Sequence, residues 1–275
     1  MSSVSKTKII KVNAGSSIDA DDLLAVEEPM EIRLEYGPKD NRVKKSISVT
    51  MRTPGSDGEL ATGFLFTEGI ISAASDVVSV SYPKADNKNI ILVSLNENIT
   101  PVISLLERNF YTTSSCGVCG KASIEAVRTT CAIPDSFDKI RVPAPIIYEL
   151  PALLRRQQEV FENTGGLHAC ALFDTNGKLL FSREDVGRHN ALDKLIGTAL
   201  NEHLLPLDSH ILMLSGRASF ELIQKAVMAG IKIVAAVGAP SSLATEMAEE
   251  WGMTLIGFLR DGRFNIYSGA ERIVI

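Results

Sequence analysis

The sequence predicts a layered α/β domain preceded by a small α+β unit. From residue 167 onward, short apolar segments alternate with amphipathic segments of helical length, which is the pattern of a layered α/β fold. Two apolar segments, 211–214 and 231–237, contain almost no polar residues, as in central strands buried on both faces. Before residue 110, the strand-like segments alternate apolar and polar residues, which predicts half-buried strands.

These patterns divide the 275-residue chain into three parts, and the length suffices for buried cores. We assign residues 1–110 to the small α+β domain. Residues 111–144 form a cysteine loop, a helix and a linker, and residues 145–275 form the α/β domain. Three prolines within 133–145 favour the linker.

The first part contains predicted strands and one predicted helix. The strands are expected at 6–13, 30–36, 43–50, 76–82 and 89–95. The helix is expected after Pro54 and Gly55, with Ser56 or Asp57 as its cap and with Leu60, Phe64 and Leu65 on one face. No cluster of acid, base or nucleophile occurs there, so we interpret this part as a docking or structural domain.

The second part contains a predicted helix over about 120–130. The third part begins with an amphipathic stretch over 146–164 that ends at Gly165 and Gly166. Two strands joined by the Asn176-Gly177 turn follow. The remaining elements are listed in chain order: strands 167–174 and 178–185, helix 188–203, strand 211–216, helix 219–230, strand 231–238, helix 241–252, and strands 254–259 and 263–268.

Composition and charge narrow the class of protein. The net charge of −5 argues against a general nucleic-acid binder. Four cysteines are too few for a disulfide scaffold. The N-terminus lacks the apolar region of a signal peptide, and no stretch approaches the roughly 20 apolar residues that span a bilayer. We therefore predict a cytoplasmic protein that does not interact with membranes.

The segment SSCGVCGK contains Cys116 and Cys119 between small residues, ahead of a predicted helix. A helix N-terminus lowers the pKa of a thiol and favours the reactive thiolate. Three interpretations remain open: a dithiol redox couple, a zinc site and a carrier of persulfide sulfur. His168 and Cys170 share a strand face and are candidate further zinc ligands, although a cysteine in an apolar run such as ACALF is more often a core residue. Cys131 has no partner in the sequence.

Polar, glycine-bearing segments follow several predicted strands, and ligands of open α/β sheets bind at such ends. They are 183–190, 215–219, 238–242 and the turn 258–263. Arginine side chains suit phosphate, and Ser219, Ser241 or Ser242 can cap the helices that follow. This predicts a pocket for an anionic ligand such as a nucleotide. For His189, a ligand contact, a general acid and a capping residue remain open. Neither a P-loop nor a nicotinamide-binding glycine motif is present.

Several long motifs in order resemble the formate dehydrogenase accessory sulfurtransferase family, FdhD. They are SSCGVCGK, TGGLHACALF, REDVGRHNALDKLIG, SGRASFELIQKAVMAG and VGAPSSLATEMAEEWGMTLIGFLRDGRFNIYS. The resemblance implies a cytidine-deaminase-like fold for the larger domain. It also implies a sulfurtransferase that takes persulfide sulfur from a cysteine desulfurase. The sulfur is passed to the molybdenum or tungsten bis(molybdopterin guanine dinucleotide) cofactor used by formate dehydrogenase.

The resemblance also implies site residues. Cys116 is expected to carry the persulfide, and Cys119 to assist it. The cofactor-binding run maps onto Phe258, Leu259, Arg260, Asp261, Gly262 and Arg263. We expect Arg217, Gly238, Ser241 and His189 to complete the pocket, and a free guanine nucleotide to occupy the same place. A homodimer is implied, with one pocket for each dinucleotide of the cofactor.

Two other function classes remain. One is a non-catalytic chaperone that binds the cofactor and formate dehydrogenase, with a structural or zinc-binding C-x-x-C. The other is an active deaminase-like hydrolase. The second is weak because His168 is followed by Ala169 and Cys170, so the glutamate of the H-x-E signature is missing.

Overall fold

The computed structural model describes residues 2–83, 87–101, 140–260 and 262–275. The N-terminal elements are β1 (Val4–Asn13), β2 (Ser16–Ala25), β3 (Glu28–Tyr36), β4 (Val43–Arg52), α1 (Asp57–Thr67), η1 (Ala74–Asp76), β5 (Val77–Ser81) and β6 (Ile90–Leu95). Next come β7 (Val142–Pro143), α2 (Ala144–Arg155), α3 (Glu159–Thr164), β8 (His168–Asp174), β9 (Leu179–Asp185) and α4 (Arg188–Asn201). The chain ends with β10 (His210–Leu214), α5 (Phe220–Met228), β11 (Ile233–Ala236), α6 (Ser242–Glu250), β12 (Thr254–Arg260), β13 (Arg263–Ser268), η3 (Ala270–Arg272) and β14 (Ile273–Val274).

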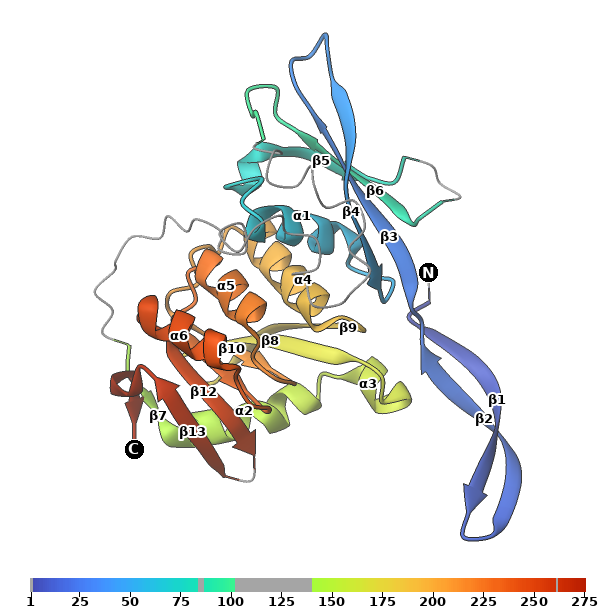
Figure 1. The fold of residues 1–275 in the computed structure, drawn as a ribbon, viewed down its shortest axis with the longest axis vertical. Coiled ribbons are helices and arrows are strands. Elements are labelled where there is room, and N and C mark those ends of the chain that lie inside the picture. The colour runs from blue at the N-terminus through green and yellow to red at the C-terminus, as the bar shows by residue number, and fades with distance from the viewer. Residues whose placement is uncertain (1, 84–86, 102–139, 261) are drawn as a thin grey trace.

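A six-stranded sheet forms the centre of the predicted α/β domain, in the order β13-β12-β11-β10-β8-β9. Strands β10, β11 and β12 are parallel, and the other pairs are antiparallel. Alternate residues of the strands enter two separate apolar clusters, one shared with α4, α5 and α6 and the other with α2. The predicted α/β layers, with helices on both faces, are therefore confirmed (Figure 1).

The first part is built on a four-stranded sheet in the order β4-β3-β6-β5. Met30, Ile32 and Leu34 of β3 are fully buried, because they point toward α1. Helix α1 lies between this sheet and α4 (Figure 1). One apolar cluster includes residues of both sheets, so the two parts share a core. The predicted boundary near residue 110 lies outside the described residues.

The contact between α1 and α4 is close. A Cβ atom added to Gly197 would collide with the backbone oxygen of Glu59, and one added to Gly63 would collide with that of Asp193. Beside this crossing, the buried Asp193 accepts hydrogen bonds from Lys225 Nζ at 2.9 and 3.0 Å and from the Thr67 hydroxyl at 2.8 Å. Glycine at the contact, together with charges that are paired within the protein, thus allows α1 and α4 to pack directly against each other.

A second polar network fastens the end of β4 to the start of α4. Lys194 Nζ lies 2.7 Å from the buried carboxylate of Asp185 and donates to the Thr53 carbonyl at 2.8 Å. The same carboxylate accepts from the Thr53 backbone N–H at 3.1 Å and from the Asn190 side chain at 3.1 Å. We call these two networks, with the glycine crossing between them, the joint.

Two sequence expectations differ from the structure. No strand is predicted for the segment of β2, which carries three aspartates among few apolar residues, yet it pairs with β1 over ten residues in a hairpin that projects from the body (Figure 1). The predicted side-chain cap of α1 is wrong. Ser56 occupies the N-cap position without a capping bond, and Asp57 instead pairs with the buried Arg52 at 3.0 and 3.1 Å.

The amphipathic stretch 146–164 is split into α2 and α3 by a break over residues 156–158. Gly165 ends α3 with a φ of 67°, as expected for a glycine C-cap. The helix expected over 120–130 and most of the linker lie outside the described residues. Within the part of the chain that the structure describes, no helix is long and apolar enough to cross a membrane.

Candidate functional site

The loops that follow β10 and β11 lie next to each other and next to Gly257 and Phe258, which belong to the second half of β12. The Gly238 N–H donates to the Gly216 carbonyl at 2.9 Å, and the Phe258 N–H donates to the Gly238 carbonyl at 3.1 Å. The Ser241 N–H donates to Ala218 at 3.0 Å. These bonds continue the sheet past its strands, at the edge where parallel α/β sheets bind ligands. We call residues 215–219, 237–241 and 257–258 the strand-end site.

Close packing explains why glycine occupies two positions of the strand-end site. A Cβ atom on Gly238 would lie 3.0 Å from the backbone and side chain of Arg217. One on Gly257 would lie 2.8 Å from the ring of Pro240. Side chains there would push the loops apart. The sequence prediction that Arg217, Gly238 and Phe258 come together is therefore supported by the geometry.

The helices α5 and α6 begin differently at this edge. Ser241 caps α6, because its hydroxyl accepts from the Ala244 N–H at 3.2 Å, as predicted. Ser219 stands at the same position before α5, but its hydroxyl makes no capping bond. It lies 3.4 Å from Nε2 of His189 instead. The Ser219 hydroxyl therefore does not cap α5, and the Glu221 carboxylate in the first turn accepts a backbone N–H instead.

His189 reaches the strand-end site from the first turn of α4. Its Nε2 lies 3.5 Å from Oε2 of Glu221 on α5. Burial alone raises the pKa of Glu221, but the hydrogen bond and charge of His189 outweigh it and hold the pKa below its ordinary value. Ser219 and Glu221 contact the same ring nitrogen. This differs from the relay of a serine hydrolase, in which the hydroxyl and the acid bind opposite nitrogens.

His168, at the start of β8, also faces this edge. Its Nδ1 would be 3.4 Å from a Cβ atom on Gly216. Burial lowers the pKa of His168, and the charges of three neighbours lower it further: Arg188, His189 and Arg217. The Nε atom of Arg188 is buried and has no hydrogen-bond partner among the described residues. An anion bound here would meet one buried donor that has no partner among the described residues, the Nε atom of Arg188.

The residues of the run Phe258–Arg263 lie in different environments. Phe258 has a positive φ of 53° and a side chain that is 38% exposed, beside the Gly238 loop. Leu259 packs into the core beneath α2, so only its backbone can face a ligand. Arg260 and Arg263 are opposite one another in the hairpin of β12 and β13, and Gly262 supplies the turn with a φ of 70°. Asp261 lies outside the described residues.

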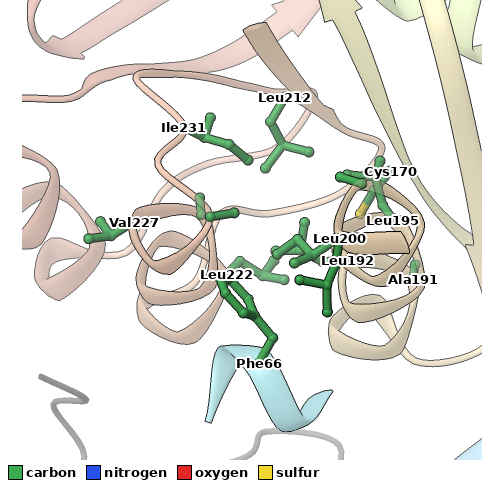
Figure 2. Close-up of a cluster of buried hydrophobic side chains, with 14 of the residues drawn as sticks. Phe66, Cys170, Ala191, Leu192, Leu195, Leu200, Leu212, Leu222, Val227 and Ile231 are labelled. Atoms are coloured by element: carbon green, nitrogen blue, oxygen red, sulfur yellow. The ribbon is translucent and has the colours of Figure 1, made fainter. Parts of the chain in front are cut away.

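Arg183 was predicted as a phosphate donor of the segment 183–190, and Cys170 was left open between a zinc ligand and a core residue. Arg183 donates to both carboxylate oxygens of Glu59 at 2.6 and 2.8 Å, so its guanidinium binds α1 rather than a ligand. Cys170 is 2% exposed and packs against α4 near Leu195 (Figure 2), and burial raises the pKa of its thiol. It is a core residue. Within the described residues, no group of three or more His, Cys, Asp or Glu side chains can hold a metal.

Sequence reasoning treated His168 only as a candidate zinc ligand. The sequence signal that could have located His168 was strand alternation. This alternation places His168 on the same sheet face as Cys170, which is the face toward α4. Cys116 and Cys119 lie outside the described residues, so their predicted roles stay predictions, as does that of Cys131.

Comparison with known proteins gives relatives along the whole chain. The model of the FdhD/NarQ family matches residues 25–274. A "Sulfur carrier protein FdhD" of Mycolicibacterium paratuberculosis is 50% identical, covering 99% of this chain and 100% of the relative. Proteins of the same name from Streptomyces coelicolor and Sulfurisphaera tokodaii are 47% and 43% identical; each alignment covers 98% of this chain and, respectively, 95% and 99% of the relative.

A crystal structure of a candidate formate dehydrogenase accessory protein from Desulfotalea psychrophila is similar in fold. Its TM-score is 0.72 at 24% identity, and 98% of this chain and 99% of that chain are covered. The mixed α/β fold is thus confirmed, whereas the cytidine-deaminase likeness stays a prediction. Because the family model and these relatives span nearly the whole sequence, the chain belongs to the FdhD/NarQ family.

Proposed function

We propose that this chain is a sulfur carrier that takes persulfide sulfur from a cysteine desulfurase. It transfers the sulfur to the molybdenum or tungsten bis(molybdopterin guanine dinucleotide) cofactor required by formate dehydrogenase. The observation that carries this proposal is the identity of up to 50%, over 99% of the chain, with relatives named sulfur carrier proteins. The bound cofactor is the substrate of the reaction, since it leaves with the dehydrogenase.

The sulfur is carried by Cys116. Its thiolate attacks the outer sulfur of the desulfurase persulfide, and the desulfurase thiolate leaves, so that Cys116 becomes a persulfide. Cys119 then attacks the inner sulfur of Cys116. A Cys116–Cys119 disulfide forms, and the outer sulfur leaves as hydrosulfide toward the metal of the substrate. The two thiols supply the electrons, and a thiol reductant restores them before the next transfer.

The strand-end site supports this function because its chemistry suits the guanine dinucleotide arms of the substrate. Each arm carries a diphosphate, and guanidinium groups are forked donors for phosphate. Arg217 and Arg188 belong to this edge, and the Nε atom of Arg188 is buried without a hydrogen-bond partner among the described residues. Phe258 presents an exposed ring beside them, and such a ring offers a stacking surface to a base.

Two further features belong to the proposal. In a homodimer, two strand-end sites would hold the two dinucleotide arms of one substrate molecule. The carrier acts before formate dehydrogenase is active. It works in the cytoplasm, because its thiols stay reduced there.

The decisive experiment is mass spectrometry of the intact protein after incubation with a cysteine desulfurase and cysteine. We expect a mass increase of one sulfur atom that is lost in Cys116→Ser. It should remain in Cys131→Ser, the matched control outside the C-x-x-C. An adduct that persists in Cys116→Ser moves the carrier role to another cysteine.

Complementation of formate dehydrogenase activity separates the carrier from the chaperone. We expect the double variant Cys116→Ser, Cys119→Ser to fail. Normal activity with that variant, or stoichiometric zinc in the purified protein, favours a cofactor-binding chaperone whose cysteines have a structural role.

A further inference from the structure

We propose that His168 binds the diphosphate of a guanine nucleotide and takes up one proton from solvent when it does so. This inference rests on the proposed function, because it assumes that the strand-end site binds the nucleotide arms of the substrate. It adds a ligand-binding residue that lies outside both the C-x-x-C and the Phe258–Arg263 run.

The position of His168 is fixed from both sides. Its strand pairs with β9, where His168 is opposite Asp185, and with β10, where Cys170 is opposite Leu214. The Ala169 N–H donates to the Ser215 hydroxyl at 2.8 Å, and the Ser215 N–H donates back to the Ala169 carbonyl at 3.0 Å. These bonds hold the residue beside His168 against the β10 loop, so the imidazole rests next to Gly216.

The groups that act on the imidazole come from several elements. Two belong to the start of α4, Arg188 and His189, and one belongs to the loop after β10, Arg217. Asp185 at the end of β9 is the opposing carboxylate, but Lys194 pairs with it at 2.7 Å. Glu221 on α5 lies near His189, not His168. The charge facing the imidazole is therefore mainly positive.

This surplus of positive charge makes the protonation state depend on the ligand. Without an anion, burial and the two guanidinium groups favour the neutral ring and hold the pKa of His168 below its usual range. A diphosphate brings at least two negative charges to the same groups and reverses the sign of their effect. The ring then gains a proton and both of its nitrogens become donors, while the ligand keeps its own charge.

The proton balance fixes the direction of the pH dependence. The pKa of His168 is lowered in the free protein and raised in the complex, so binding takes up a proton between these two values. The affinity for the diphosphate must then rise as pH falls through the bound-state value, and it stops rising below the free-state value. A shift of one pKa unit corresponds to a tenfold change in affinity.

Isothermal titration calorimetry with GDP tests the inference. Titrations at pH 7 in two buffers of different ionisation enthalpy measure the protons taken up per bound GDP. We expect net uptake by the unmodified protein, and a loss of that uptake in His168→Gln. We also expect an affinity about tenfold lower for this variant at pH 6.5 and a flatter dependence on pH. Guanosine, which lacks the phosphates, should show no uptake through His168.

His210→Gln is the matched control. His210 is the first residue of β10, at the end of this strand that is opposite the strand-end site. Burial also lowers the pKa of this histidine. This variant should keep both the uptake and the affinity for GDP. Comparing variants removes the contribution of the phosphate's own titration, because that contribution is the same in all three proteins.

The outcomes separate the inference from the proposed function. No binding of GDP to the unmodified protein overturns the nucleotide site and this inference together. Binding without proton uptake, or uptake that survives in His168→Gln and is lost in His189→Gln, overturns the role of His168 alone. If His168→Gln does not fold, nuclear magnetic resonance titration of the histidine rings in the unmodified protein decides. GDP must raise the pKa of one ring that is below 6.5 in its absence.

Discussion

The joint and the strand-end site are built from the same kinds of residue and differ in how their polar groups are paired. In the joint, Lys225 and Lys194 are almost fully buried, and each contacts a carboxylate and a further oxygen within the protein. In the strand-end site, Arg188 has a buried Nε without a partner among the described residues, and the Ser219 hydroxyl makes no capping bond to α5.

Glycine shows the same contrast. Gly63 and Gly197 let two helices touch, and the space that they leave is filled by the backbone of the facing helix. Gly238 and Gly257 let the segments of the strand-end site approach each other closely, at Arg217 and Pro240 respectively. Paired groups hold the fold together, whereas unpaired groups are available to a ligand. Substitutions in the joint should therefore change stability, and substitutions in the strand-end site should change binding.

The largest effect is expected from Lys225→Met. Burial lowers the pKa of Lys225, but the charges of Asp193 and Glu68 outweigh it and raise the pKa, so the lysine is charged. Removing it leaves Asp193 buried without its cation, which costs about 3–5 kcal/mol. Urea unfolding measures the loss. The double variant Lys225→Met, Asp193→Asn should recover part of it. A loss below about 1 kcal/mol would mean that the joint does not depend on this pair.

A smaller effect is expected from Gly197→Ala. The added methyl group meets the Glu59 backbone and forces α1 and α4 apart, at a cost of about 1–3 kcal/mol. Gly58→Ala on α1 is the matched control, since its methyl group would be 3.5 Å from Val80, an ordinary contact. That variant should be neutral or more stable by up to about 1 kcal/mol. Equal stability of Gly197→Ala and Gly58→Ala contradicts the close crossing.

Arg217→Gln tests the other side of the comparison. We expect the affinity for GDP to fall roughly tenfold, because a charge-assisted hydrogen bond to phosphate is worth about 1.5–3 kcal/mol. The unfolding midpoint should stay unchanged. Arg155→Gln serves as the control: Arg155 lies over the ring of Phe161 on the exposed side of α2. If Arg217→Gln lowers the unfolding midpoint and leaves the affinity of the folded protein for GDP unchanged, Arg217 has a structural role instead.

The smallest effect is expected from Glu59→Gln. Burial raises the pKa of Glu59, but Arg183 outweighs burial and holds the pKa below its ordinary value. The pair therefore stabilises the fold above pH 4.5, and this stabilisation is lost as pH falls through the folded-state pKa. Because both side chains are about a quarter exposed, we expect at most about 1 kcal/mol at pH 7. The stability of the variant and the unmodified protein should converge at low pH.

Periodicity predicted the elements wherever one face of a segment is apolar. The strands β10 and β11 were identified because both faces are buried, and α4, α5 and α6 were located before, between and after them. Hairpin β1-β2 is the exception. Its strand β2 has little apolar periodicity, and it forms because the turn at Ala14 and Gly15, both with positive φ, brings it against β1.

The strand-end site was predicted in part. Arg217, Gly238 and Ser241 were found because they follow strands and precede helices, a pattern that the sequence displays directly. Arg183 lies near the end of β9, and its partner Glu59 is 124 residues away, so no local pattern shows the pair. Leu259 lies within a motif of polar residues, yet strand alternation turns it into the core.

The sequence by itself determined the alternation of strands and helices, the glycine and serine loops at strand ends, and the family to which the chain belongs. These are local patterns, and local backbone preferences produce them. Only the tertiary structure decided which charges are paired. Arg183 is engaged by Glu59, whereas His168 faces Arg188 and Arg217, because the strength of an electrostatic interaction depends on distance and burial in space, not on separation along the chain.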